Sequence, residues 1–438
     1  MQPSLKALVL RGSAWMIVGH GAGQVIRLVK SLILTRLLFP EAFGMMALVG
    51  VVMYGLQMLS DVGLVQSVLR DKRGDEPDFL NTVWTMQAVR GALLFGASCL
   101  IAWPMAAFYA QPDLALLIPV TGLTVLCSGF NSHALYTCRR RMEFGRLVTL
   151  ELATEVVAFG ATVLWAYLYP TVWSLVGGAL VSSLLALVGS HVFFRGLPHR
   201  FRWEAESVRA LAGFGKWIFL SSAVTFVAQQ SDLLLLGRYL EMSQLGVYSI
   251  AITLSSAVYA LVIRVNHSVL YPAYGRIVQN EAHRLGHTYH RARLGVDALL
   301  IFPIGVLMLI GSRVVDLLYD GRYHEAGWIF QVLCVRLLMA AALSNSEACL
   351  VALGHPKYAL MQNVGRAAWI LAGIPIGWSL GGVKGVVVAV ALCELPVMAV
   401  LWVGLIRHRM FSLWSELRSV LFAAGGALLG FGLLALLR

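Results

Sequence analysis

Long apolar stretches recur along the whole of this 438-residue chain, separated only by short polar breaks. A helix needs about 20 mostly apolar residues to cross a bilayer, and its backbone groups must be satisfied within the segment. We therefore predict an all-α, polytopic membrane protein, with twelve spans at roughly 14–34, 43–69, 81–108, 114–138, 147–168, 171–195, 212–236, 244–269, 294–318, 327–352, 359–380 and 385–406. A shorter apolar stretch, at about 419–437, is a candidate thirteenth helix.

The composition supports the membrane class. The chain is 59% hydrophobic and 13% charged, whereas a soluble protein carries about 25% charged residues. All six cysteines fall in apolar segments without metal-ligand spacing, which favours a packing role. Lys6 and Arg11 precede the first apolar stretch, but no small-residue cleavage site ends it, so we expect a membrane helix and not a signal peptide.

Lys and Arg residues are concentrated in alternate connections between the predicted spans. Basic connections face the cytoplasm in membrane proteins, so we place these loops and the N-terminus on the cytoplasmic side of the membrane. The formal net charge of +12 is spread over many short loops, which argues against a nucleic-acid partner. The basic connections lie near 70–73, 139–146, 195–209, 276–293, 357 and 407–409.

The two halves of the chain resemble each other. The residues that match at one constant shift include Trp15 with Trp217, Arg36 with Arg238, and Gly44 with Gly246. Six helices per half make a parallel repeat, which places a central cavity between the halves. The predicted organisation is a six-helix lobe at 1–195, a cytoplasmic linker at 196–211, a six-helix lobe at 212–406, and a tail at 407–438 with one or two extra helices as an option.

Cationic side chains occur inside the predicted spans, where they usually face a cavity or a partner. In the first span, Ser13, His20, Gln24, Arg27 and Ser31 fall on one helical face. Guanidinium and ammonium groups suit a phosphate-bearing substrate. A structural ion pair is the alternative for each cation, and Arg336 is left undecided. The substrate-binding candidates are Arg27, Lys30, Arg264, Arg90, Arg366, His20 and Gln24.

Carboxylates inside the spans are candidates for ion coupling, because a carboxyl group in a low-dielectric cavity can exchange protons near neutral pH. The candidates are Asp232, Glu394, Asp61 and Glu155. Each could instead pair with a buried arginine. His283, His287 and His290 recur at helical spacing, which we interpret as a basic surface helix in preference to a metal site. No motif for ATP-driven transport or hydrolysis is found.

Four segments carry a family resemblance: SLILTRLLFPEAFGMMALVGVV at 31–52, LSDVGLVQSVLRDK at 59–72, AFYAQPDL at 107–114 and RRRMEFGRL at 139–147. They resemble the polysaccharide-transport family of Wzx-type oligosaccharide flippases, above all its colanic and teichuronic acid exporter branch. The similarity covers most of the first half of the chain.

The resemblance implies the multidrug/oligosaccharidyl-lipid/polysaccharide (MOP, MATE-like) fold, with two six-helix bundles around a cationic central cavity. It also implies a location in the bacterial inner membrane and alternating access, which carries a polyprenyl-diphosphate oligosaccharide to the outer leaflet for exopolysaccharide, capsule or O-antigen synthesis. A proton or sodium gradient is the expected driving force and no cofactor is expected. The polysaccharide polymerase of the same pathway is a candidate partner.

Two other functions stay open. An ion-coupled multidrug or lipid exporter of the same superfamily is the first, although a cation exporter calls for an acidic, aromatic cavity. A membrane polysaccharide polymerase or glycosyltransferase is the second, although the external loops here are short and no paired-Asp motif appears. We therefore predict a flippase and not an enzyme.

Overall fold

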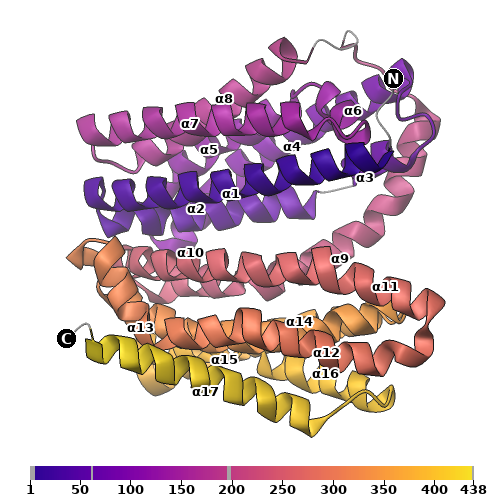
Figure 1. The fold of residues 1–438 in the computed structure, drawn as a ribbon. Helices are drawn as coiled ribbons and strands as arrows, with labels where there is room; N and C mark the ends of the chain where they lie inside the picture. The colour runs from indigo at the N-terminus through magenta and orange to yellow at the C-terminus, as the bar shows by residue number, and fades with distance from the viewer. Residues whose placement is uncertain (1–4, 61–62, 195–198, 437–438) are drawn as a thin grey trace. The chain divides into compact units, whose positions relative to one another are not determined.

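The computed structural model describes residues 5–60, 63–194 and 199–436. These residues are helical almost throughout, and no β-strand occurs among them (Figure 1). They form two compact units, Met1–Phe226 and Val227–Arg438. The boundary falls inside one long helix, and the predicted lobe and linker limits stay a prediction.

Prolines help to define the start of two helices in the first unit. Pro40 stands at the start of one helix and Pro77 at the start of another, where the missing backbone N–H is no loss. The helices are α1 (Leu5–Leu37), α2 (Pro40–Leu59), α3 (Leu64–Arg70), α4 (Pro77–Tyr109), α5 (Leu114–Gly129), α6 (Ala134–Arg140), α7 (Phe144–Leu168), α8 (Trp173–Val192) and α9 (Ala205–Tyr239), which continues into the second unit.

The second unit contains two π-helical turns, η1 (Asn266–Leu270) and η3 (Asp297–Ile301), each followed by a helix with proline in its first turn. Such wide turns bend helices and are frequent at functional sites. Short 3₁₀ turns are η2 (Ala282–Arg284) and η4 (Gly321–Tyr323). The helices are α10 (Met242–Val265), α11 (Tyr271–Asn280), α12 (Leu285–Val296), α13 (Phe302–Leu318), α14 (Glu325–Ala352), α15 (Lys357–Ala391), α16 (Leu395–Arg407) and α17 (Leu413–Leu436).

Ten segments of the described chain are long and apolar enough to cross a membrane, or eleven when α5 and α6 count as one span bent by 61°. The all-α polytopic prediction is thus confirmed. The apparent number is smaller than the predicted one partly because α15 runs through the predicted turn at Gly381 and Gly382. That turn is present as a local break, with Gly382 at a positive φ of 54°.

The candidate thirteenth helix is confirmed as α17, which packs against α13. A Cβ atom added at Gly426 would lie 2.1 Å from the carbonyl oxygen of Phe302, and one at Gly305 would lie 2.5 Å from that of Ala423. Small residues let helix backbones approach closely in membranes. The two helices therefore depend on glycine at this crossing.

We expect Gly426→Ala to weaken this crossing and lower the thermal stability of the protein, because neither backbone can yield to the new methyl group. Overpacking of this kind costs about 1–3 kcal/mol. Gly432→Ala is the matched control on the same helix, since a Cβ there meets no atom within 4 Å. Equal melting temperatures for the two variants in detergent would contradict the close approach.

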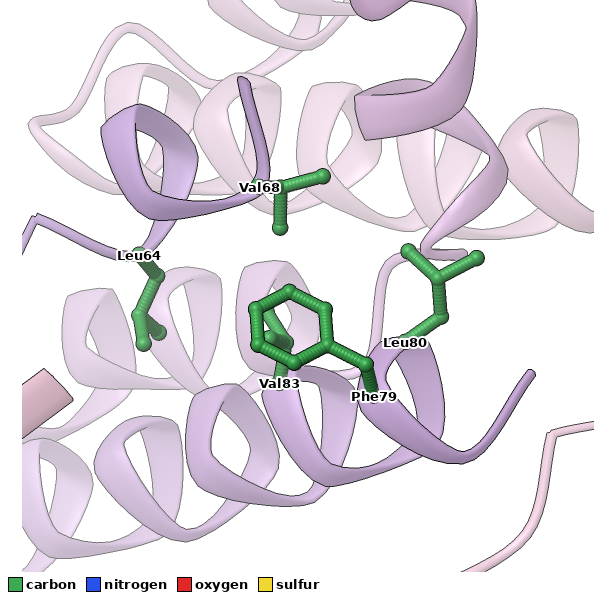
Figure 2. Close-up of a cluster of buried hydrophobic side chains, with 5 residues drawn as sticks. All are labelled: Leu64, Val68, Phe79, Leu80 and Val83. Carbon is green, nitrogen blue, oxygen red and sulfur yellow. The ribbon is translucent and has the colours of Figure 1, made fainter. Parts of the chain in front are cut away.

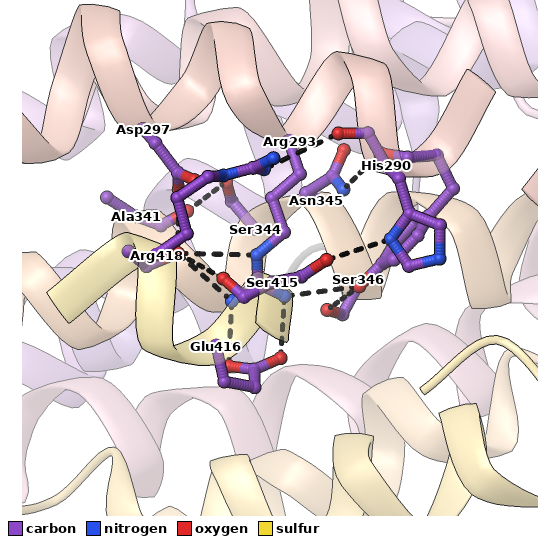
Figure 3. Close-up of polar contacts among 12 residues, drawn as sticks. His290, Arg293, Asp297, Ala341, Ser344, Asn345, Ser346, Ser415, Glu416 and Arg418 are labelled. Carbon is purple, nitrogen blue, oxygen red and sulfur yellow. Dashed lines mark hydrogen bonds and ion pairs between the residues drawn. The ribbon is translucent and has the colours of Figure 1, made fainter. Parts of the chain in front are cut away.

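A buried polar network also ties α17 to α12 (Figure 3). Arg293 is 1% exposed and donates from both terminal nitrogens to Glu416, at 2.7 Å each. Arg418 lies 3.1 Å from the Asp297 carboxylate, which also accepts a 2.7 Å hydrogen bond from Ser419. The tail of the chain is thus an integral part of the second unit.

Connections predicted to be cytoplasmic lie together at one end of the first unit. Helix α3 packs onto the start of α4 through a buried apolar cluster of Leu64, Val68, Phe79, Leu80 and Val83 (Figure 2). Arg140 of α6 donates a 2.6 Å hydrogen bond to the carbonyl oxygen of Val68 and pairs with Asp75 at 3.0 Å.

Residues 199–204, which we call the strap, lie along the same end of α4. The backbone N–H groups of Arg200 and Arg202 donate to the side chains of Asn81 and Thr85, at 2.9 and 3.0 Å. The ring of His199 lies 4.3 Å from that of His133 and 4.8 Å from that of His191, centre to centre. The strap is therefore anchored through a cluster of three imidazoles.

We expect the strap to loosen in acid. Burial, and secondarily the neighbouring His191, lowers the pKa of His199 below that of a free imidazole. The folded strap favours the neutral ring. The contribution of His199 to the stability of the strap is therefore fully present above about pH 6.5 and is lost as the pH falls through the lowered pKa. Amide hydrogen exchange across residues 199–204 should accelerate at about pH 5 beyond the intrinsic rate. The acceleration should disappear in His199→Gln, and its persistence there would exclude this imidazole as the cause.

Candidate functional site

The predicted polar face of α1 meets a predicted coupling residue on α7. Arg27 donates to Gln24 at 3.2 Å and lies 3.5 Å from the Glu155 carboxylate. The Arg27 side chain is 55% exposed, so this long contact is weak and leaves the guanidinium accessible. Lys30 is half-buried and His20 is exposed. The structure thus joins one substrate-binding candidate to one coupling candidate.

A cavity of about 760 Å³ lies among α2, α4, α5 and α6 of the first unit. We call it the N-lobe cavity. Its cations are Arg90 and Arg139, and no Asp or Glu is among its described lining residues. The polar groups around them include Gln57, Gln87 and Asn131. A cavity with cations and no carboxylate favours an anionic ligand.

The position of Arg90 is fixed by the end of α2. Its Nε donates to the Ser60 hydroxyl at 3.0 Å, and its Nη2 donates to the carbonyl oxygen of Gln57 at 2.7 Å. The Gln57 carbonyl lies in the last turn of α2, where backbone carbonyls lack intrahelical partners and attract cations, and it also accepts a 2.9 Å hydrogen bond from the Ser60 hydroxyl. Within the described residues, Nη1 of Arg90 makes no hydrogen bond and stays available to a ligand.

Other lining residues of the N-lobe cavity are also polar. Gln87 donates to the carbonyl oxygen of Ser128 at 2.7 Å and accepts a hydrogen bond from the hydroxyl of Tyr136. The Oδ1 atom of Asn131 is buried without a partner in the described structure. Sequence reasoning missed Arg139 as a site residue, because it was counted with the basic loop that sets orientation.

A charge cluster forms in the second unit around Glu394. This carboxylate is 1% exposed, accepts a 2.7 Å hydrogen bond from Arg366, and lies 3.7 Å from Arg336. Asp232 is separately held by the Tyr248 hydroxyl at 3.1 Å and by the Leu233 backbone N–H. Two predicted residues of opposite role, Arg366 and Glu394, are thus a buried ion pair, which was the alternative that the sequence left open.

Glu394 stands where the predicted span 385–406 is broken. Helix α15 ends at Ala391 and α16 begins at Leu395. Pro396 has no backbone N–H to donate back across the gap. Broken helices at membrane depth are tolerated where they line a cavity and are common at transporter ion sites.

The remaining candidates are less informative. Arg264 of α10 is half-buried and makes no ion pair with any described residue. Asp61 lies outside the described residues. In the proposed basic surface helix, His290 packs within the unit, since its Nδ1 lies 2.9 Å from the Ser415 hydroxyl.

Comparison with known proteins gives a consistent picture. The family model for polysaccharide biosynthesis proteins matches residues 33–328. The lipopolysaccharide biosynthesis protein WzxC of Escherichia coli strain K12 is 22% identical over 398 residues, or 90% of this chain and 80% of WzxC. Two solved structures are similar in fold. The lipid II flippase MurJ in its inward closed conformation gives a TM-score of 0.71 at 12% identity, over 96% of this chain and 99% of that chain. An inward-facing MATE family transporter of the MOP superfamily gives 0.68 at 13% identity, over 91% and 95%.

These matches confirm the predicted MOP fold and the resemblance to Wzx-type exporters. The two similar solved proteins are a flippase and a transporter, which agrees with the prediction of a transporter and not an enzyme. With its candidate spans, the chain is a multi-pass membrane protein. The chain belongs to the family of polysaccharide biosynthesis proteins.

Proposed function

We propose that this protein flips a polyprenyl-diphosphate-linked oligosaccharide from the cytoplasmic to the outer leaflet of a bacterial inner membrane. The two halves alternate access to the two sides, with the N-terminus in the cytoplasm. The observation that carries the proposal is the N-lobe cavity, which contains Arg90 and Arg139 without a carboxylate among its described lining residues. A diphosphate is the part of such a substrate that needs cations.

The chemistry of the cavity fits a diphosphate. Two donors of Arg90, Nε and Nη2, anchor the side chain. The third, Nη1, has no acceptor among the described residues and can donate to a ligand. Arg139 is 42% exposed, and its ion pair with Glu151 is long, at 3.9 Å. Its guanidinium is therefore also accessible to a ligand. Arginine matches phosphate oxygens with paired donors. Arg27, Lys30 and Arg264 are proposed as further contacts along the path.

The proposal is tested by a flipping assay in proteoliposomes. The lipid-linked oligosaccharide is placed in both leaflets, and an impermeant glycosidase is added outside. Purified protein should make nearly all of the glycan accessible, whereas protein-free vesicles should protect the inner half. Protection unchanged by the protein would contradict the proposal. Export of organic cations without glycan movement would support the multidrug alternative.

We further propose that a proton or sodium gradient drives transport through the charge cluster. Glu394→Gln should cut gradient-driven flipping at least about tenfold and make the residual rate independent of the gradient, because the buried Arg366 and the half-buried Arg336 lose their counter-charge. Glu394→Asp, which keeps the charge, should retain the gradient dependence. Glu325→Gln, at an exposed carboxylate, is the control for lost charge. Rates are measured with and without an imposed gradient. Unaltered gradient dependence in folded Glu394→Gln would exclude this carboxylate as the coupling group.

A further inference from the structure

A second pocket, of about 320 Å³, lies wholly within the second unit, and we call it the C-lobe pocket. We propose that the C-lobe pocket binds a sugar ring of the transported glycan, so that the glycan and the diphosphate are recognised in different lobes. This inference rests on the proposed function and extends it to the part of the substrate that distinguishes one polysaccharide from another.

The pocket offers the side chains that recognise sugar hydroxyls. Its wall includes the amides of Gln229, Gln362 and Asn363, the phenol of Tyr259 and the carboxylate of Glu347. Each amide or carboxylate can bond to two adjacent hydroxyls, because it presents two polar atoms in one plane. A tyrosine ring adds an apolar face for the C–H side of a sugar.

Several of these groups are held in place while keeping free capacity. Gln362 donates to Glu347 at 2.7 Å, and Asn363 accepts from Arg366 at 3.3 Å. The Gln229 amide and the Tyr259 hydroxyl make no hydrogen bond to any residue that the structure describes. A ligand site requires polar groups that are held in place and keep unused hydrogen-bonding capacity.

Arg366 supplies an independent indication of a ligand. The residue is 8% exposed and lines the pocket, yet its Nε–H has no hydrogen-bond partner in the described structure. A buried donor without a partner is destabilising and calls for an acceptor. The oxygen of a sugar hydroxyl in the pocket supplies such an acceptor once the Arg366 side chain turns its Nε–H toward it.

The charges of the pocket disfavour a phosphate. The positive charge of Arg366 is matched by Glu394 at 2.7 Å, and Glu347 adds a further carboxylate to the same wall. A neutral, hydroxyl-rich ligand avoids the repulsion that these carboxylates impose on an anion. The volume corresponds to about ten water molecules, which is too large for one bare cation and within the range of small-molecule sites.

The backbone around the pocket supports a binding role. Asn266 and His267 belong to the π-helical turn η1, and Glu394 lies at the break between α15 and α16. The turn is pinned by Asn266, which donates to the carbonyl oxygen of Ser344 at 3.1 Å. Two irregular segments thus converge on one cavity, as expected where backbone polar groups border water or a ligand.

The test compares two lipids on the full-length protein in nanodiscs. One is polyprenyl diphosphate without glycan, and the other is the lipid-linked oligosaccharide extracted from the cells that make this protein. Tyr259→Phe and Asn363→Ala should each bind the glycan-bearing lipid about three- to tenfold more weakly, from one lost neutral hydrogen bond. Both should bind the bare lipid as wild type does. Asn280→Ala, an exposed asparagine that bonds only within its own helix, should change neither affinity.

Each other outcome is informative. Equal weakening of both lipids, or no effect of either variant, overturns the sugar subsite while leaving the flippase proposal intact. A variant effect that requires sodium and is the same for both lipids assigns the pocket to an ion and also overturns the subsite. Failure of wild type to bind either lipid contradicts the proposed function itself.

Discussion

Arg90→Ala should slow translocation of the lipid-linked oligosaccharide about 10- to 100-fold. The substitution removes a guanidinium that α2 holds at the edge of the N-lobe cavity through Ser60 and Gln57. Hydrogen bonds to charged groups contribute about 1.5–3 kcal/mol, and each 1.4 kcal/mol is a factor of ten in rate. Initial rates in the proteoliposome assay measure the loss.

Two further variants make this result specific. Arg90→Lys should be intermediate, because an ammonium keeps the charge but cannot match the planar donor geometry. Arg146→Ala removes a 71% exposed cation that pairs with Glu143 outside the cavity, and it should translocate normally. Equal activity of Arg90→Ala and Arg146→Ala, in proteins with equal melting temperatures, would place the phosphate site elsewhere.

Glu416→Ala should destabilise the second unit by about 3–5 kcal/mol, the usual cost of removing one partner of a buried ion pair. Arg293 is 1% exposed and makes two 2.7 Å hydrogen bonds to this carboxylate (Figure 3). Without it, the guanidinium stays buried with hydroxyl partners only. Denaturant unfolding in detergent measures the difference.

The matched control is an exposed pair of the same kind. Glu281→Ala removes a carboxylate that is 49% exposed and lies 2.7 Å from Arg284, and it should cost less than about 1 kcal/mol. The double change Arg293→Met with Glu416→Leu should recover much of the loss, because an apolar pair needs no counter-charge. A loss at Glu416 no greater than that at Glu281 would contradict the buried network.

The helical membrane fold could be predicted because it follows from local composition. Apolar stretches of sufficient length must become helices in lipid, whatever their neighbours. The breaks inside those stretches depend on tertiary structure and were not predicted. The predicted span 43–69, for example, is divided into α2 and α3, with Gly63 at a positive φ of 71°.

The site was predicted only in part, since the sequence gives the charges but not their partners. Arg366 and Glu394 were each identified, yet their pairing spans 28 positions and requires α15 to fold back at Gly382. Arg27 and Glu155 are 128 positions apart. Arg139 was missed because a basic loop and a phosphate site use the same residue type.

The most direct test of phosphate recognition by the N-lobe cavity compares two substrates on the wild-type protein. One is the diphosphate-linked oligosaccharide, and the other is the same oligosaccharide on the same lipid through a neutral linkage. If the cations of the cavity recognise the diphosphate, the neutral lipid should be flipped at least about tenfold more slowly. Equal rates for the two lipids would show that the charge is irrelevant and would contradict the account.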